Sequence, residues 1–267
     1  MVTLIIPTLN EEKTIRQVIE LAGKSSLVNE ILVVDDKSQD DTLKVAKVDS
    51  VKLYTSTKLG KGASMRDGML LAKNEAIVYL DADILTYPSD IIERLTSPIL
   101  NNEADFVKSC FDRQAGRVTE LVAKPLLSIL FPDLNKFSQP LSGMVAARKS
   151  FLKDIEFEND YGVDIGLLID MHLKGARIAE VNIGYIENRM QSWEALAKMS
   201  REVSLSIIKR ARAIEGYNLD TLKNMSLIRT QMDYAIRDSL LGLHKMVIFD
   251  MDNTILEDSF ITTAAEA

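Results

Sequence analysis

The sequence contains a single cysteine and no long hydrophobic run. Cys110 alone cannot form a disulfide within the chain, which favours a reducing, cytoplasmic location. The residues after Met1 enter a strand pattern directly, without the charged segment and apolar core of a secretory leader. The nearest approach to a membrane span, residues 121–131, is interrupted by Lys124, Pro125 and Ser128. We therefore expect no transmembrane segment.

The sequence also lacks an excess of positive charge. Its 32 lysines and arginines stand against 39 aspartates and glutamates, which gives a net charge of −7. The basic residues form no dense stripe, so we expect neither a nucleic acid nor an anionic membrane as the main partner. With 267 residues, 46% of them hydrophobic, the chain can bury one large domain, or one domain plus an appendage.

Short β-branched runs alternate with amphipathic stretches, a pattern typical of an α/β fold with a mostly parallel sheet covered by helices. The predicted strands are residues 2–6, 31–34, 51–54, 76–80, 105–111 and 178–183. The predicted helices are residues 10–22, a helix capped by Ser38 or Asp40 that runs to about residue 48, residues 63–73, 119–130 and 163–173, and a long C-terminal extension from residue 193 to about residue 214. Ligands of such sheets bind at the carboxyl ends of the strands.

Three polar clusters follow predicted strands. Asp81-Ala82-Asp83 comes directly after an apolar strand, and two carboxylates at this spacing can hold a divalent cation that bridges a nucleotide diphosphate. A plain cap or turn is the alternative interpretation. The other two clusters, Pro7-Thr8-Leu9-Asn10-Glu11 and Asp35-Asp36, are either turn residues or donors and acceptors for a uracil edge and ribose hydroxyls.

Two glycine-containing loops precede predicted helices. In Gly60-Lys61-Gly62 the glycines permit a close backbone approach and the lysine can pair with phosphate, although a simple turn would have the same pattern. Gly116-Arg117-Val118-Thr119 precedes a helix start, where free amides and the arginine would bind an anion. That interpretation predicts an acidic second substrate, and an ordinary capped helix is the alternative.

Together these motifs resemble the GT-A fold glycosyltransferases and, within them, the glucosyl-3-phosphoglycerate synthase family. The resemblance covers about residues 4–199. Its general part is residues 6–12, 35–42 and 81–83. Its specific part is Gly60-Lys61-Gly62, the stretches 116–121 and 124–127, Gln139-Pro140-Leu141, and residues 161–168.

The resemblance implies transfer of glucose, with retention, from a nucleoside diphosphate donor, usually UDP-glucose, to the 2-hydroxyl of 3-phosphoglycerate. It also implies Mg²⁺ or Mn²⁺ as cofactor and a homodimer. By matching motif positions, the donor would contact Pro7, Thr8, Leu9, Glu11, Asp36, Lys61, Asp81 and Ala82. The phosphoglycerate would contact Gly116, Arg117, Val118 and Thr119. The metal ligands would be Asp81, Asp83 and Asn188, and the catalytic pair Asp83 and Asp164.

Three positions depart from the family pattern. Asp164 stands where the family usually has a glutamate near the donor sugar. Asn188 stands where a histidine usually binds the metal, and Ile186 replaces a usual arginine. Because an amide is an uncharged ligand, we expect weaker metal affinity or a different third ligand. Arg189 is a candidate to compensate for the missing arginine.

The C-terminal residues carry a separate pattern. Residues 246–249 form a predicted buried strand, and the following Asp250-Met251-Asp252-Asn253-Thr254 resembles the first motif of haloacid dehalogenase phosphatases. The rest of such a site cannot fit before Ala267, so we expect no phosphatase activity and interpret the segment as the severed start of a fused phosphatase. The predicted domains are thus residues 1–215, a helical connector 216–245, and the fragment 246–267.

Other functions fit parts of this pattern. A sugar-nucleotide nucleotidyltransferase shares the α/β design and a glycine-lysine loop, but its usual glycine-rich loop is missing after the first strand. A silent nucleotide-sugar binding module would accommodate the changes at Ile186 and Asn188. Within the transferases, another sugar donor or a lipid-phosphate acceptor is a further alternative.

Overall fold

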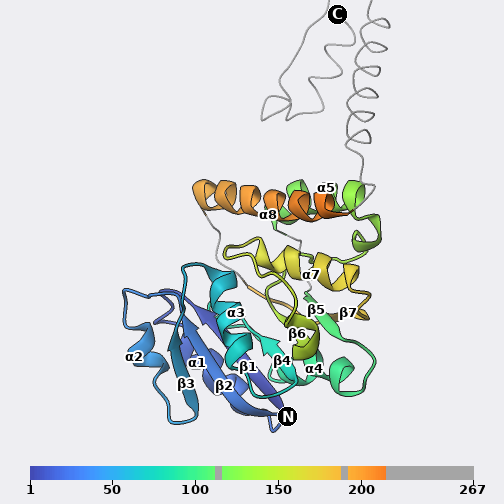
Figure 1. Ribbon diagram of the computed structural model, residues 1–267. Helices are drawn as coiled ribbons and strands as arrows, with labels where there is room; N and C mark the ends of the chain where they lie inside the picture. The colour runs from blue at the N-terminus through green and yellow to red at the C-terminus, as the bar shows by residue number, and fades with distance from the viewer. Residues whose placement is uncertain (112–115, 188–191, 215–267) are drawn as a thin grey trace, which may run out of the picture. The chain divides into compact units, whose positions relative to one another are not determined.

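The computed structural model describes residues 1–111, 116–187 and 192–214 (Figure 1). These residues lie within one compact unit, Met1–Glu215. Asn188, Arg189, the predicted connector and the phosphatase-like segment lie outside the described residues. Among the described helices, none combines the length and the apolar character needed to cross a bilayer.

A mixed sheet forms the centre of the described part of the chain. Its strands are β1 Val2–Thr8, β2 Val28–Asp35, β3 Val51–Thr55, β4 Ala76–Tyr79, β5 Phe106–Cys110, β6 Val145–Arg148 and β7 Ile178–Asn182. The strand order is β3-β2-β1-β4-β6-β5-β7, and every pairing is parallel except the two made by β6 with β4 and β5. The predicted α/β architecture with a mostly parallel sheet is confirmed, and it is the GT-A arrangement. Strand β6 is an addition that the sequence patterns did not indicate.

Helices cover both faces of this sheet. They are α1 Ile15–Ala22, α2 Thr42–Ala46, α3 Lys61–Leu71, α4 Ile91–Leu100, the π-helical turn η1 Thr119–Ala123, α5 Lys124–Leu130, the 3₁₀ turn η2 Pro132–Leu134, α6 Lys149–Leu152, α7 Val163–Leu173 and α8 Trp193–Ala213. Figure 1 shows α8 beside α5, with α7 between α8 and the sheet. The helix predicted from residue 10 begins instead at Ile15, because residues 10–14 form a turn whose amides bond to the loop after β2 and to the first residue of α2. Helices α4 and α6 were not predicted.

The alternation of side chains along the strands divides the core in two. On β1, Ile5 faces the layer built by α3, α5, α7 and α8, whereas Leu4 and Ile6 face α1, α2 and α4. Because both faces are covered, the central strands are apolar at nearly every position. Val33 and Val34 of β2 alternate in the same way.

Helix α3 approaches the sheet closely at Gly68. A Cβ atom at this position would lie 2.4 Å from Cγ2 of Ile5, so a larger residue would push the helix away. The first turn of α3 is equally tight, because a Cβ at Gly62 would lie 1.7 Å from the carbonyl oxygen of Glu158. The two glycines therefore fix α3, and with it Lys61, against the sheet and the loop before α7.

Candidate active site

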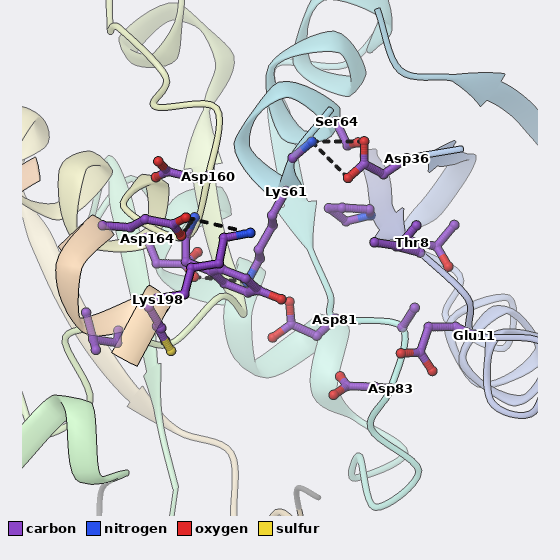
Figure 2. Close-up of a pocket in the computed structure, with 18 residues that line it drawn as sticks. Thr8, Glu11, Asp36, Lys61, Ser64, Asp81, Asp83, Asp160, Asp164 and Lys198 are labelled. Atoms are coloured by element: carbon purple, nitrogen blue, oxygen red, sulfur yellow. Dashed lines mark hydrogen bonds and ion pairs between the residues drawn. The ribbon is translucent and has the colours of Figure 1, made fainter. Parts of the chain in front are cut away.

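A cavity of about 360 Å³ lies at the carboxyl ends of β1, β2 and β4. It is closed on the other side by the loop before α7 and by α8 (Figure 2). The lining residues are Pro7, Thr8, Leu9, Glu11, Asp36, Gly60, Lys61, Ser64, Asp81, Ala82, Asp83, Leu141, Asp160, Tyr161, Asp164, Lys198, Met199 and Glu202. All residues predicted to contact the donor line this cavity, and so do Asp83 and Asp164.

One wall is built by the ends of β1 and β2. Asp36 is buried, and both of its carboxylate oxygens accept from the backbone N–H of Gly60, at 2.9 and 2.8 Å. Burial raises the pKa of Asp36 above its ordinary value. The buried hydroxyl of Thr8 has no hydrogen-bond partner among the described residues, so it is available to a ligand.

The loops that follow β1 and β2 are bonded to each other. Asn10 and Lys37 adopt positive φ angles of 56° and 65°. The N–H of Asn10 donates to the Ser38 hydroxyl at 2.9 Å, and the N–H of Gln39 donates to the Asn10 side chain at 2.8 Å. These bonds hold the turn in which Glu11 faces the cavity.

Lys61 lies at the centre of the cavity, on the first residue of α3 (Figure 2). Its ammonium is 3.0 Å from Oδ1 of Asp81 and 2.9 Å from Oδ2 of Asp164. Burial alone would lower the Lys61 pKa, but the two carboxylates outweigh it and raise the pKa above its ordinary value. Lys61 is therefore a permanent positive charge that joins the strand-end wall to α7.

The cavity as a whole is strongly acidic. Two lysines, Lys61 and Lys198, face seven acidic residues, namely Glu11, Asp36, Asp81, Asp83, Asp160, Asp164 and Glu202. Burial, together with the carboxylates of Asp81 and Glu11, raises the pKa of Asp83 to about 6. A diphosphate would be repelled from such a cavity unless a cation accompanied it.

This charge balance fits a divalent cation held by Asp81 and Asp83. Within residues 1–111, 116–187 and 192–214, no three His, Cys, Asp or Glu side chains gather closely enough to form a complete ligand set by themselves. The third predicted ligand, Asn188, lies outside the described residues.

The wall opposite the strand ends comes from α7, α8 and the loop before them. Asp164 is the second residue of α7 and is 3% exposed; its Oδ1 has no hydrogen-bond partner among the described residues. Asp160, Tyr161, Lys198, Met199 and Glu202 complete this wall and were not predicted as site residues. The packing of α8 on α7 brings Lys198 to the cavity.

The predicted acceptor residues do not line this cavity. Gly116 and Arg117 are exposed, whereas Val118 and Thr119, at the start of η1, are buried. The Arg117 guanidinium stacks on the Trp193 ring, 4.6 Å from its centroid. Since Trp193 begins α8 and Lys198 lies further along the same helix, residues 116–119 lie near the α8 side of the site.

Ile186 is fully buried in the apolar core on the α1 and α4 face of the sheet. Its side chain therefore packs in the protein interior and does not face the cavity. The substitution that the resemblance marked at this position thus has a packing role in this chain.

The fold is a mostly parallel sheet, and its strand ends carry a metal-compatible Asp-x-Asp and an acidic cavity centred on Lys61. These features define a nucleotide-sugar transferase of the GT-A class. The chain belongs to glycosyl transferase family 2, whose family model matches residues 3–154.

Relatives within this family are similar over most of the chain. The glucosyl-3-phosphoglycerate synthase of Petrotoga mobilis is 34% identical over 247 residues, which cover 82% of this chain and 76% of that protein. The Mycobacterium tuberculosis enzyme of the same name, solved with Mn²⁺, UDP-glucose and phosphoglyceric acid, superposes with a TM-score of 0.76 at 33% identity, covering 81% of each chain. Its structure with Mg²⁺ and UDP gives a TM-score of 0.75 at 34% identity, again over 81% of each chain.

Proposed function

We propose that this protein transfers glucose from UDP-glucose, or another nucleoside diphosphate glucose, to the 2-hydroxyl of 3-phosphoglycerate with retention, giving glucosyl-3-phosphoglycerate. The observation that carries the proposal is the single cavity in which the strand-end residues, the Asp81-Ala82-Asp83 motif and Asp164 converge around Lys61. The names and bound molecules of the relatives support the same reaction.

In this proposal the donor lies across the cavity. Its uridine contacts Pro7, Thr8, Leu9, Glu11 and Asp36. Lys61 and the backbone at Ala82 bind the diphosphate region, and Asp164 accepts hydrogen bonds from glucose hydroxyls through its free Oδ1. The unpartnered hydroxyls of Thr8 and Ser64 are further donors and acceptors for the same ligand.

Asp81 and Asp83, with Asn188, are the residues that would hold Mg²⁺ or Mn²⁺. When bound, this ion neutralises charge on the departing diphosphate. Lys61 adds a second positive charge at the same place, and the low exposure of its side chain, 18%, strengthens its effect.

The acceptor is assigned to residues 116–119. Arg117 would pair with an anionic group of 3-phosphoglycerate, and the first amides of η1 would bind its remaining oxygens. The side of the cavity formed by α8 is then the place where acceptor and donor sugar meet.

The test is release of UDP from UDP-glucose with Mg²⁺, with and without 3-phosphoglycerate, and the mass of the sugar product. Release that needs both metal and acceptor supports the proposal. Pyrophosphate release from UTP and glucose 1-phosphate, assayed separately, would indicate a nucleotidyltransferase. Binding of UDP-glucose without release, also with Mn²⁺ or GDP-glucose, would indicate a silent binding module.

Two variants test donor binding and acceptor binding separately. Asp83→Ala should abolish metal-dependent binding of the donor, measured by calorimetry, because it removes a charged ligand. Arg117→Ala should raise the 3-phosphoglycerate concentration needed for half-maximal rate roughly tenfold or more and leave donor affinity nearly unchanged. Equal loss of donor and acceptor affinity in Arg117→Ala would contradict this division.

The domain limits 1–215, 216–245 and 246–267 remain predictions, as do the homodimer, the cytoplasmic location and the phosphatase-like origin of the last segment. Analytical ultracentrifugation of the whole chain would test the homodimer, for which the long helix α8 offers a surface.

A further inference from the structure

Lys108 is a fully buried lysine on β5 and one of the largest completely buried side chains among the described residues. It does not line the cavity. Burying an ammonium carries a large desolvation cost, and an apolar side chain of similar length would avoid this cost. A lysine at this position therefore calls for a role beyond filling space.

The ammonium of Lys108 joins two segments that border the cavity. It donates to the carbonyl oxygen of Ser142 at 2.6 Å and to the carbonyl oxygen of Asp164 at 3.0 Å. The neighbouring hydroxyls of Ser109 and Ser142 are also hydrogen-bonded, at 2.5 Å. Lys108 thereby ties β5 to the loop before β6 and to the first turn of α7.

Both of these segments contact Lys61. A Cβ atom on Gly143 would lie 2.2 Å from the Lys61 ammonium, so the loop held by Lys108 packs directly against that group. Asp164 pairs with Lys61 through Oδ2 and presents its free Oδ1. An aspartate has a short side chain, so the place of its carboxylate follows the place of its backbone closely.

The positive charge of Lys108 also helps to hold Asp164 in place. Burial lowers the pKa of Lys108 to about 8, against the opposing influence of the Asp164 carboxylate. At neutral pH the side chain is therefore mostly an ammonium, with donors for both carbonyl oxygens and a positive charge beneath Asp164.

We propose that Lys108 is a positioning residue that holds Asp164, through its backbone carbonyl, in the place where its carboxylate binds the donor sugar. The inference rests on the proposed function, because it assumes that Asp164 contacts the glucose of the donor. Lys108 itself touches no substrate.

The experiment compares how tightly the protein binds UDP-glucose and UDP, each with Mg²⁺ and without acceptor, by calorimetry. The dissociation constant of UDP-glucose divided by that of UDP isolates the contacts made to glucose, because effects on the shared UDP part cancel. Asp164→Ala should raise this ratio roughly tenfold, and Lys108→Met should raise it roughly fivefold with little change in UDP affinity. In the double variant the effects should not multiply, because both act through one carboxylate.

Lys149→Met is the matched control. Lys149 also donates to two backbone carbonyls, those of Leu70 and Ala72, but at the end of α3 opposite to Lys61. Its replacement should leave the ratio unchanged. If Lys108→Met does not fold, as judged by circular dichroism, Lys108→Gln takes its place, because its amide still donates hydrogen bonds although it carries no charge. The ratio should then rise by a smaller factor.

The outcomes separate the two hypotheses. An unchanged ratio in Asp164→Ala would overturn the glucose contact of Asp164 and, with it, the role of Lys108. A raised ratio in Asp164→Ala with an unchanged ratio in a folded Lys108 variant would overturn the positioning role alone. Acceptor-dependent UDP release by the wild type, measured separately, tests the proposed function as a whole.

Discussion

Replacing Arg210 with methionine would remove the cationic partner of Asp170 and one of the two cationic partners of Glu158, which keeps Lys209 at 3.2 Å. The Arg210 side chain is 7% exposed. Its guanidinium donates to Asp170 from Nε at 2.8 Å and from Nη2 at 2.7 Å, and to Glu158 from Nη1 at 2.9 Å. It also reaches the Ser206 hydroxyl at 2.8 Å. With two longer bonds to the carbonyl oxygens of Ser206 and Glu156, six hydrogen bonds, three of them to charged acceptors, would be lost together.

The expected loss of unfolding free energy is about 3 kcal/mol. Removing one partner of a fully buried ion pair costs about 3–5 kcal/mol, because the other charge stays buried. Asp170 and Glu158 each keep 20% of their side-chain surface in contact with water, which places the expected loss at the lower end. With a urea dependence of about 2–3 kcal/mol/M, the midpoint of unfolding should fall by about 1 M.

Urea unfolding followed by circular dichroism measures this shift. Arg212→Met is the control, because Arg212 is exposed on the same helix and its loss should change the free energy by less than about 0.5 kcal/mol. A loss below about 1 kcal/mol in Arg210→Met would refute the reasoning. The variant should also bind UDP-glucose more weakly, since Glu158 precedes the cavity residues Asp160 and Tyr161.

Two further changes test other parts of the fold. Hydrogen bonds from Arg177 hold the pKa of Asp105 at about 2, below the ordinary 3.8. The ionised Asp105 therefore adds about 2 kcal/mol to the free energy of unfolding above pH 4, and this contribution is lost as the pH falls through 2. The stability difference between wild type and Asp105→Asn should therefore narrow by about 1 kcal/mol from pH 7 to pH 3 in urea titrations; a constant difference would contradict the assignment. Gly62→Ala should cost about 2 kcal/mol or more and weaken UDP binding, because its Cβ meets the Glu158 carbonyl, which cannot rotate away; unchanged UDP affinity would argue against this contact.

The strand-end half of the site could be predicted from the sequence for a physical reason. Parallel neighbouring strands bring their carboxyl ends to one edge, so residues 7–11, Asp36 and residues 81–83 had to converge once their strands were recognised. Lys61 followed from the glycines that flank it. These are local patterns placed by one simple rule of topology.

The opposite wall depends on packing between distant segments. Lys198 and Glu202 lie four residues apart on α8, a spacing typical of any exposed helix face, and only the docking of α8 turns them to the cavity. Lys108 lay within a predicted strand, and nothing local marked its burial. Helix α4 did have a signal, since residues 91, 92, 95 and 99 are apolar at helical spacing.

Strand β6 was missed because it is short and carries two alanines, which have low strand propensity. Its neighbours on both sides supply the burial that its own side chains do not indicate.

The position of β6 also has a consequence for how the molecule is assembled. Strands β1 to β4 pair with one another using only the first 79 residues, whereas β5 joins the sheet solely through β6 and β7 in the described structure. Until residues 145–148 are available, β4 presents an open edge that invites pairing with other chains. The wall of the cavity built by the strand ends can therefore form early on the ribosome, and the opposite wall, built by α7 and α8, only after β6 has inserted. A chain interrupted between residues 80 and 144 should carry a nearly complete strand-end wall and aggregate through β4.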